Sequence, residues 1–211
     1  MQNSVNPFRV SIFIDGYTFL KVNNYYLRHH AAKSRIFLPG LYHFILFEVR
    51  KRLQKKVPLI IDKHYYHVHT AEHNNINSVI QQKEDNFKNF LQKFGYQIHY
   101  PTSYVNFAKN PNYDLINDLA MFSLYKSMDM VVLVSTQGFY ANTVKILKQR
   151  NIPVLLLGWN FNYKSKENLV RWKTDFSLKE NVTAYFPMEK IMDNYETDKI
   201  VRGMFIANKN S

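Results

Sequence analysis

Asp15 is the residue of this sequence best placed to do chemistry. It follows the largely apolar run Val10–Ile14 and precedes Gly16. Such a run predicts a buried strand of a parallel sheet, and an aspartate at the carboxyl end of that strand faces the crevice where open α/β folds place ligands. The alternative is a simple turn, because Asp-Gly is a common turn dipeptide. Since Tyr17–Arg28 has the pattern of a helix rather than of a returning strand, we interpret Asp15 as a site residue.

Asp114 and Asp118 form a second acidic pair. The apolar spacing predicts a helix over 114–125, with Leu115, Leu119 and Phe122 facing inward. Asp118 then lies one turn after Asp114 on the same face. A carboxylate in the first turn of a helix is also favoured by the helix dipole, which is the structural alternative for Asp114.

Four histidines, His64, His67, His69 and His73, lie in or just after a predicted strand over 58–68. His67 and His69 would share one face of that strand, a spacing that suits a metal ion. No carboxylate accompanies them at a matching spacing. We therefore interpret these residues as surface or core histidines.

The charge of the chain is strongly positive. Its 211 residues include 28 Lys and Arg against 16 Asp and Glu, a formal net charge of +12. This excess favours a polyanionic partner such as RNA, although base bias in the genome is an alternative origin. The basic residues that follow the first strand are the candidate nucleic-acid contacts: Lys21, Arg28, Lys33 and Arg35.

The chain contains no cysteine, which excludes disulfides and thiolate metal sites. Its N-terminus lacks a basic segment followed by an apolar run, and no apolar stretch approaches the roughly 20 residues that span a bilayer. We expect a soluble, cytoplasmic protein without a membrane partner. We also expect a single domain over 1–211, with a core at about 9–159 and an extension over 160–211 packed on it.

Predicted strands and helices alternate along most of the chain. Strands are expected at 10–16, 58–68, 96–100, 130–135 and 152–157, and helices at 17–30, 41–54, 79–94, 114–125 and 140–150. This order predicts an α/β fold, a doubly wound, mainly parallel sheet of about five strands with helices on both faces. Right-handed crossovers then place the carboxyl ends of the strands together, so that Asp15, Ser135 and Gly158 should converge.

The pattern weakens after Asn160. The weaker pattern there predicts a helix over Lys164–Lys173, a short strand over Thr183–Phe186 and a closing helix over Glu196–Phe205.

Three segments together carry a family resemblance. Ile12-Phe13-Ile14-Asp15-Gly16 is followed by Tyr113-Asp114 at the start of a predicted helix, and then by Val131-Val132-Leu133-Val134-Ser135 before another. In this order and spacing they resemble the NYN domains, which are PIN-like, metal-dependent ribonucleases. The resemblance covers roughly Arg9–Trp159.

The resemblance implies a PIN-like sheet, RNA as the partner, and Mg²⁺ or Mn²⁺ as the cofactor. Such hard cations are held by carboxylate oxygens, and they activate the water that attacks a phosphodiester. The metal ligands it implies are Asp15 and Asp114, with Asp118 as a third catalytic acid. The residues it implies around them are Gly16, Thr18, Ser135 and Gln137.

The chain departs from the family pattern at several positions. The family's Asp-Gly-x-Asn is Asp15–Thr18 here, without the asparagine. Its Ser-Gly-Asp-Ser-Asp-Phe aligns with Ser135–Tyr140, which places Gln137 and Phe139 where the family has acids. A lysine of the family is replaced by Pro111, and a second helix carboxylate by Ala120, for which only Asp118 could substitute.

These departures predict a ribonuclease with a weakened acidic site and low or lost hydrolase activity. The alternative is a non-catalytic NYN module that binds RNA or a protein partner, including a second copy of the chain.

Two other enzyme classes fit less well. Haloacid-dehalogenase-like phosphatases also place an aspartate after an apolar first strand, and Ser135 could serve as their second hydroxyl. Their second aspartate and threonine, however, are Tyr17 and Phe19 here. A dinucleotide-binding fold is disfavoured because the chain has only 6 glycines and no glycine-rich loop after any strand.

Overall fold

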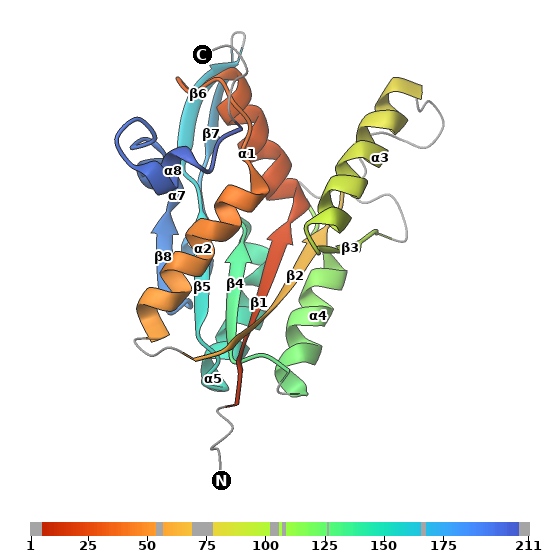
Figure 1. Cartoon of the computed structure of the whole chain (residues 1–211), viewed down its shortest axis with the longest axis vertical. Coiled ribbons are helices and arrows are strands. Elements are labelled where there is room, and N and C mark those ends of the chain that lie inside the picture. Colours follow the sequence, from red (N-terminus) through yellow and green to blue (C-terminus); the bar gives the residue numbers. More distant parts are fainter. Residues whose placement is uncertain are drawn as a thin grey trace.

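The computed structural model describes residues 6–53, 57–68, 78–101, 106, 109–125, 127–165 and 168–206. A six-stranded sheet, parallel throughout, forms its centre (Figure 1). Its strands, in order across the sheet, are β3 (Gln97–His99), β2 (Leu59–Tyr66), β1 (Phe8–Asp15), β4 (Met130–Val134), β5 (Val154–Gly158) and β8 (Ala184–Pro187). The predicted α/β fold is confirmed, with one strand more than the approximate number expected.

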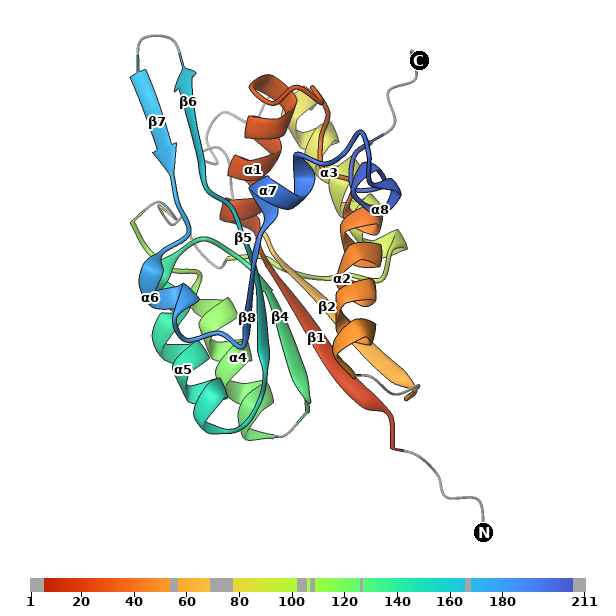
Figure 2. The same cartoon turned by 90° about the vertical axis from the view of Figure 1, so that its left-hand side faces the viewer.

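Helices cover both faces of the sheet, which Figure 2 shows nearly edge-on. One face carries α1 (Gly16–Arg28), α2 (Leu38–Leu53), α3 (Ser78–Lys93), α7 (Met188–Met192) and α8 (Lys199–Arg202). The other carries α4 (Tyr113–Leu124), α5 (Ala141–Gln149) and α6 (Phe176–Lys179), together with the short 3-10 helix η2 (Gly138–Tyr140). The fold therefore has three layers, with the sheet in the middle.

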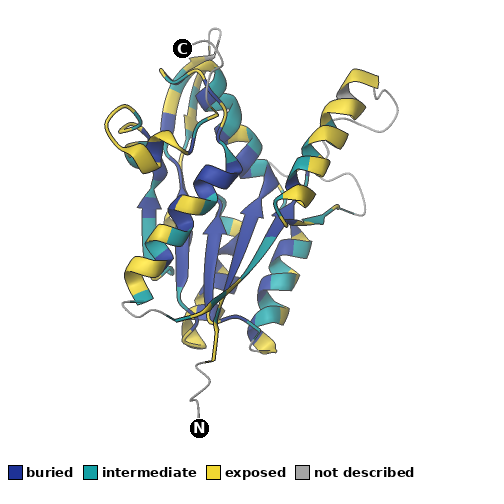
Figure 3. Ribbon diagram, viewed as in Figure 1, coloured by how far each residue is buried: buried dark blue, intermediate teal, exposed yellow. Residues whose placement is uncertain are grey.

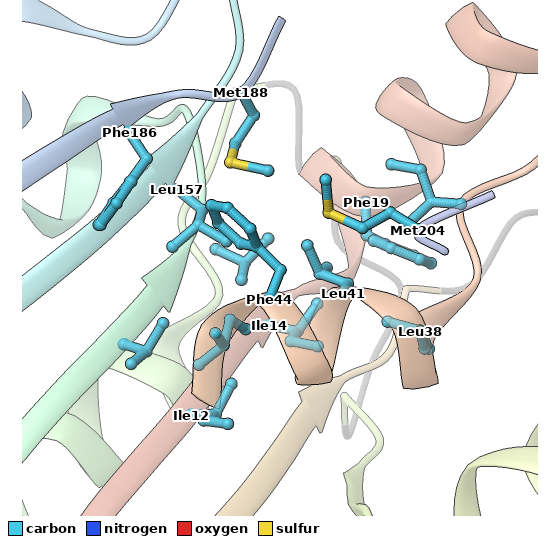
Figure 4. Packing of buried hydrophobic residues seen from close by; sticks show 14 of the residues in the cluster. Ile12, Ile14, Phe19, Leu38, Leu41, Phe44, Leu157, Phe186, Met188 and Met204 are labelled. Carbon is cyan, nitrogen blue, oxygen red and sulfur yellow. The ribbon is translucent and has the colours of Figure 1, made fainter. Parts of the chain in front are cut away.

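Alternate side chains of the central strands build two separate cores. On β1, Ile12 and Ile14 pack toward α1 and α2, whereas Phe13 packs toward α4 and α5. Figure 4 shows Ile12 and Ile14 beside Leu41 and Phe44 of α2. Burying one such side chain contributes about 1.5–3 kcal/mol. Figure 3 shows the buried strands at the centre and exposed residues along the outer part of α3.

A hairpin replaces a predicted helix after β5. β6 (Phe161–Ser165) and β7 (Asn168–Trp172) pair antiparallel in a sheet of their own. The expected helix over Lys164–Lys173 is therefore wrong. Phe161, Tyr163, Val170 and Trp172 share one face of the hairpin. Their rings pack on α1, where Phe161 stacks on Tyr25 at 4.2 Å and Trp172 contacts Tyr17. This packing favours strands over the weak helical periodicity.

The C-terminal segment is part of the same architecture. The expected strand over Thr183–Phe186 is confirmed as β8, which pairs parallel with β5. The expected helix over Glu196–Phe205 is much shorter, because α8 begins after its capping residue Asp198 and ends at Arg202. Assignment of the whole chain to one domain stays a prediction. No helix within the described ranges is long and apolar enough to cross a membrane.

Candidate functional site

The chain passes from β1 directly into α1 at Asp15 and Gly16. Asp15 caps the helix, since its Oδ1 accepts a hydrogen bond from the Tyr17 amide at 3.1 Å. Gly16 lies against β2, where a Cβ atom would collide with the carbonyl oxygen of Tyr66. Asp-Gly therefore marks a helix start pressed against a neighbouring strand, not a hairpin turn.

The second oxygen of Asp15 joins two strand ends. Oδ2 accepts hydrogen bonds from Thr18 Oγ1 at 2.8 Å and from Ser135 Oγ, just after β4, at 2.9 Å. Asp15 is only 1% exposed, and this burial raises the pKa of its carboxyl more than the hydrogen bonds lower it. The structure thus brings together four of the predicted site residues, Asp15, Gly16, Thr18 and Ser135.

The backbone after β4 closes over Asp15. The amide of Thr136 donates to Thr18 Oγ1 at 3.3 Å, and the amide of Gln137 donates to Ser135 Oγ at 3.2 Å. These bonds hold Gln137 next to the group of predicted residues. They also leave the Asp15 carboxylate almost no surface to present to a substrate.

Asp118 belongs to a separate group, here named the α4 cluster (His64, Tyr66, His99 and Asp118). Its Oδ2 accepts a hydrogen bond from the Tyr66 hydroxyl at 2.7 Å and lies 3.3 Å from His99 Nδ1. His99 Nε2 is in turn 3.0 Å from His64 Nδ1. Burial, with a smaller effect of His99, lowers the pKa of His64 to about 4. His64 is therefore neutral at physiological pH.

Asp114 lies in the first turn of α4, half-buried, after the capping residue Asn112. Its charge acts on Tyr66 and His99, the two side chains that contact Asp118. The hydroxyl of buried Tyr140 accepts a bond from the Asn112 amide at 3.4 Å, and burial and the charge of Asp15 raise the Tyr140 pKa. Tyr140 thus contacts the start of α4 and lies near enough to Asp15 for that charge to act on its hydroxyl.

The side chains can be compared with what Mg²⁺ or Mn²⁺ requires. Among the residues described, no three His, Cys, Asp or Glu side chains are grouped so that they could hold one ion. The Asp15 carboxylate is occupied by three protein donors, and Asp118 is bonded to Tyr66. A hard divalent cation needs several converging oxygen ligands. This arrangement does not fit a resident divalent cation.

A cavity of about 560 Å³ opens beside these strand ends, and we name it the strand-end cavity. It contains Gln137 and Phe139, the two positions where the family resemblance implies acids. Arg171 and Lys173 bring positive charge from the end of the hairpin. Its lining residues are Tyr17, Thr136, Gln137, Gly138, Phe139, Arg171, Trp172, Lys173, Asp175 and Ser177.

Asp175 is a cavity residue that sequence reasoning missed. Its amide donates to the carbonyl of Thr136 at 2.9 Å, and its carboxylate lies so close to Gly138 that a Cβ there would collide with it. Asp175 caps α6, because its Oδ1 accepts hydrogen bonds from the amide and the hydroxyl of Ser177. The available signal was an aspartate two residues before a serine at a helix start.

The predicted nucleic-acid residues lie at varying distances from the cavity, and none of them is among its described lining residues. Lys21 approaches it, with Nζ 5.4 Å from the ring centre of Tyr17. Arg28 lies 13 residues beyond Asp15, about 20 Å along α1. Lys33 donates to the Arg28 carbonyl at 2.8 Å, and Arg35 lies in the loop that follows. Their contact with nucleic acid stays a prediction.

The remaining histidines of the group predicted around the second strand are His67, His69 and His73. His67 lies just after β2, and its amide donates to the His99 carbonyl at 2.8 Å. His69 and His73 lie outside the described residues. His64 is buried in the core, and the core is one of the two environments that the sequence predicted for these histidines.

Comparisons with known proteins agree with this fold. A crystal structure of a protein of unknown function from Vibrio parahaemolyticus matches with a TM-score of 0.56 and 13% identity, over 98% of this chain and 100% of that one. At this identity the match shows the fold alone. No curated protein matches the chain. The family model of the NYN domain matches residues 9–177, which extends past the predicted core into α6. The chain therefore belongs to the NYN domain family.

Proposed function

We propose that this chain binds RNA at the strand-end cavity and hydrolyses it weakly or not at all. The observation that carries the proposal is the pair of cations at the cavity, Arg171 and Lys173. No carboxylate within the described ranges lies at ion-pair distance from either of them. Unpaired cations beside a cavity suit the phosphates of a nucleic acid, and the +12 charge of the chain agrees with that partner.

The low hydrolytic activity in this proposal follows from the way the acidic side chains are bonded to other protein groups. Metal-dependent hydrolysis of a phosphodiester needs carboxylates that share a cation in contact with the substrate. Here Asp15 is enclosed by Thr18 and Ser135, and Asp118 is bonded to Tyr66. Dependence on Mg²⁺ or Mn²⁺ stays an expectation of the family resemblance.

The test is to add the two acids. The variant Gln137→Asp/Phe139→Asp places carboxylates beside Asp175 and near Asp15. We expect the wild type to leave single-stranded RNA largely intact with Mg²⁺ or Mn²⁺, and the double variant to cleave it. The matched control Gln82→Asp/Gln149→Asp adds the same charge at exposed positions of α3 and α5 and should not cleave. Robust wild-type cleavage, abolished by Asp15→Asn, would instead show that the existing site is sufficient.

Asp175 favours an active ribonuclease as the second candidate. This carboxylate lies at the cavity beside Gly138, although it comes from a segment far from the other acids. If the wild type cleaves RNA through it, Asp175→Asn should remove the activity. Asp198→Asn, the same change at another helix cap, should leave it intact.

A further inference from the structure

We propose that the strand-end cavity holds one unpaired base of a single-stranded RNA, stacked on Phe139, while Arg171 and Lys173 contact the adjoining phosphates. This inference rests on the proposed RNA binding and adds the class of RNA and the residues that recognise it. It assigns a role to Phe139, which stands where the family resemblance implies an acid.

The size of the cavity suits a nucleotide. Its volume of about 560 Å³ lies within the range of about 300–1,000 Å³ typical of sites for small ligands. Three aromatic side chains line it, Tyr17, Phe139 and Trp172. Bases stack on aromatic rings of this kind in single-strand binding sites, and this stacking tolerates any base.

The aromatic walls differ in how firmly they are held. Trp172 is fixed in the hairpin, with its ring centre 5.9 Å from Tyr17 and 6.3 Å from Phe161. Phe161 is itself stacked on Tyr25 of α1. Phe139, in contrast, is 42% exposed on η2. Tyr17 and Trp172 are only half-buried and contact each other, so Phe139 is the most exposed of the three rings and the one available for stacking.

Strand geometry places the cations where a phosphate backbone could pass. Side chains alternate along β7 and its extension, so Arg171 and Lys173 point away from the face on which Trp172 packs. Lys164 of β6 is exposed and lies on the same outer face as Arg171. It pairs with Leu169, which is two residues before Arg171 on β7, and paired residues share one face of the hairpin. The hairpin therefore presents an aromatic face to α1 and a basic face outward, next to the cavity.

The combination favours single-stranded RNA over a duplex. Bases in a duplex are already stacked and paired, so an aromatic ring cannot take one without disrupting the helix. A free mononucleotide could fill the same cavity. It is too short, however, to reach Lys164 on the outer face as well, and it would gain little from the positive charge on the rest of the chain.

The test compares two exposed phenylalanines. Phe139→Ala should weaken binding of a fluorescein-labelled single-stranded oligoribonucleotide about tenfold at low salt. Phe176→Ala is the matched control, because Phe176 is 72% exposed and is not among the described residues lining the cavity, and it should bind like the wild type. Phe139→Tyr should restore binding. Thermal unfolding of each variant confirms that the fold is intact.

The tryptophans give an independent readout. Trp159 is fully buried, whereas Trp172 lines the cavity, so RNA should quench Trp172 fluorescence. An oligonucleotide of equal length without bases should bind more weakly than RNA and should not distinguish Phe139→Ala from the wild type.

The outcomes separate the two proposals. If the wild type binds single-stranded RNA but Phe139→Ala and the base-free oligonucleotide bind equally well, base stacking is overturned and RNA binding stands. Tighter binding of a duplex or equal binding of a mononucleotide overturns it as well. If the wild type binds no RNA at low salt, both proposals fail.

Discussion

The strand-end cavity and the α4 cluster lie at neighbouring strand ends, but they differ in whether their charged side chains are paired with other protein groups. In the α4 cluster, Asp118 is bonded to Tyr66 and faces His99, which in turn contacts His64. At the cavity, Arg171 and Lys173 have no carboxylate at ion-pair distance among the described residues. Internally paired groups contribute to stability, whereas unpaired groups at a cavity are available to a ligand.

Asp15 lies between these two regions and differs from both. It is buried like His64 and Tyr66 of the α4 cluster. Within the described ranges, hydroxyl and amide groups supply its hydrogen bonds, and no cation lies at ion-pair distance. Such a carboxylate positions strand ends at a cost to stability when it is charged. The comparison therefore predicts that removing a charge changes stability in the α4 cluster and at Asp15, and changes RNA binding at the cavity.

The largest expected effect on stability is the pH dependence due to His64. Its pKa of about 4 in the folded chain lies below the unfolded value of 6.5. The neutral form is therefore favoured in the fold, and the stability it contributes is present above pH 6.5 and lost as pH falls toward 4. Between pH 7 and pH 4 this should lower the free energy of unfolding by roughly 3 kcal/mol.

Urea unfolding of His64→Phe measures this contribution. Phe should fit between Phe13 and Phe122, which flank the histidine ring, and the variant should lose less stability at low pH than the wild type. The exposed His43 provides the control His43→Phe, whose free energy of unfolding should depend on pH as that of the wild type does. If the free energy of unfolding of His64→Phe depended on pH as steeply as that of the wild type, His64 would not be the source of the pH dependence.

A smaller loss is expected from Asp118→Ala. The change removes the acceptor of the Tyr66 hydroxyl, and Tyr66 is fully buried. An unsatisfied buried hydroxyl costs about 1–3 kcal/mol, measurable by chemical denaturation at pH 7. Asp114→Ala, one turn earlier, is the control, because Asp114 accepts no hydrogen bond from a described residue. Equal losses in both variants would mean that the Tyr66 bond contributes nothing.

The smallest effect, of opposite sign, is expected from Asp15→Asn. The raised pKa of Asp15 means that the fold favours the neutral carboxyl. The cost is therefore absent below the unfolded value of 3.8 and grows as pH rises above it. Asp15→Asn should raise the free energy of unfolding at pH 7 by on the order of 1 kcal/mol, and the gain should vanish at pH 3.

The same substitution at an exposed helix cap, Asp198→Asn, should give no such gain. A destabilised Asp15→Asn at pH 7 would show that the charge of Asp15 is stabilised by its hydrogen bonds after all.

The sequence predicted the central strands well, because β1, β4 and β5 are short apolar runs buried on both faces. Gly95, with φ of +72°, ends α3 as a left-handed cap, and this agrees with the helix predicted over 79–94. The hairpin was missed because its strands are short and their stability comes from aromatic packing against α1, which periodicity does not reveal.

The candidate site was predicted only in part. Asp15 and Ser135 met because the ends of adjacent parallel strands must converge. The sequence could not show that Asp118 would contact Tyr66 and His99, because these residues lie 52 and 19 positions before it in the chain. It also could not place Arg171, Lys173 and Asp175 at the cavity, because their position depends on the hairpin.

The most direct test of RNA binding at the strand-end cavity is a salt titration. Fluorescence anisotropy of a labelled single-stranded oligoribonucleotide would compare the wild type with Arg171→Ala/Lys173→Ala and with Lys145→Ala/Lys148→Ala, two exposed lysines of α5. From about 50 to about 200 mM salt, loss of two phosphate contacts should reduce the slope of log affinity against log salt by about 1.4. We predict this reduction, with weaker binding at low salt, for the cavity variant and not for the α5 variant. Equal slopes and affinities for the two variants would contradict RNA binding at this cavity.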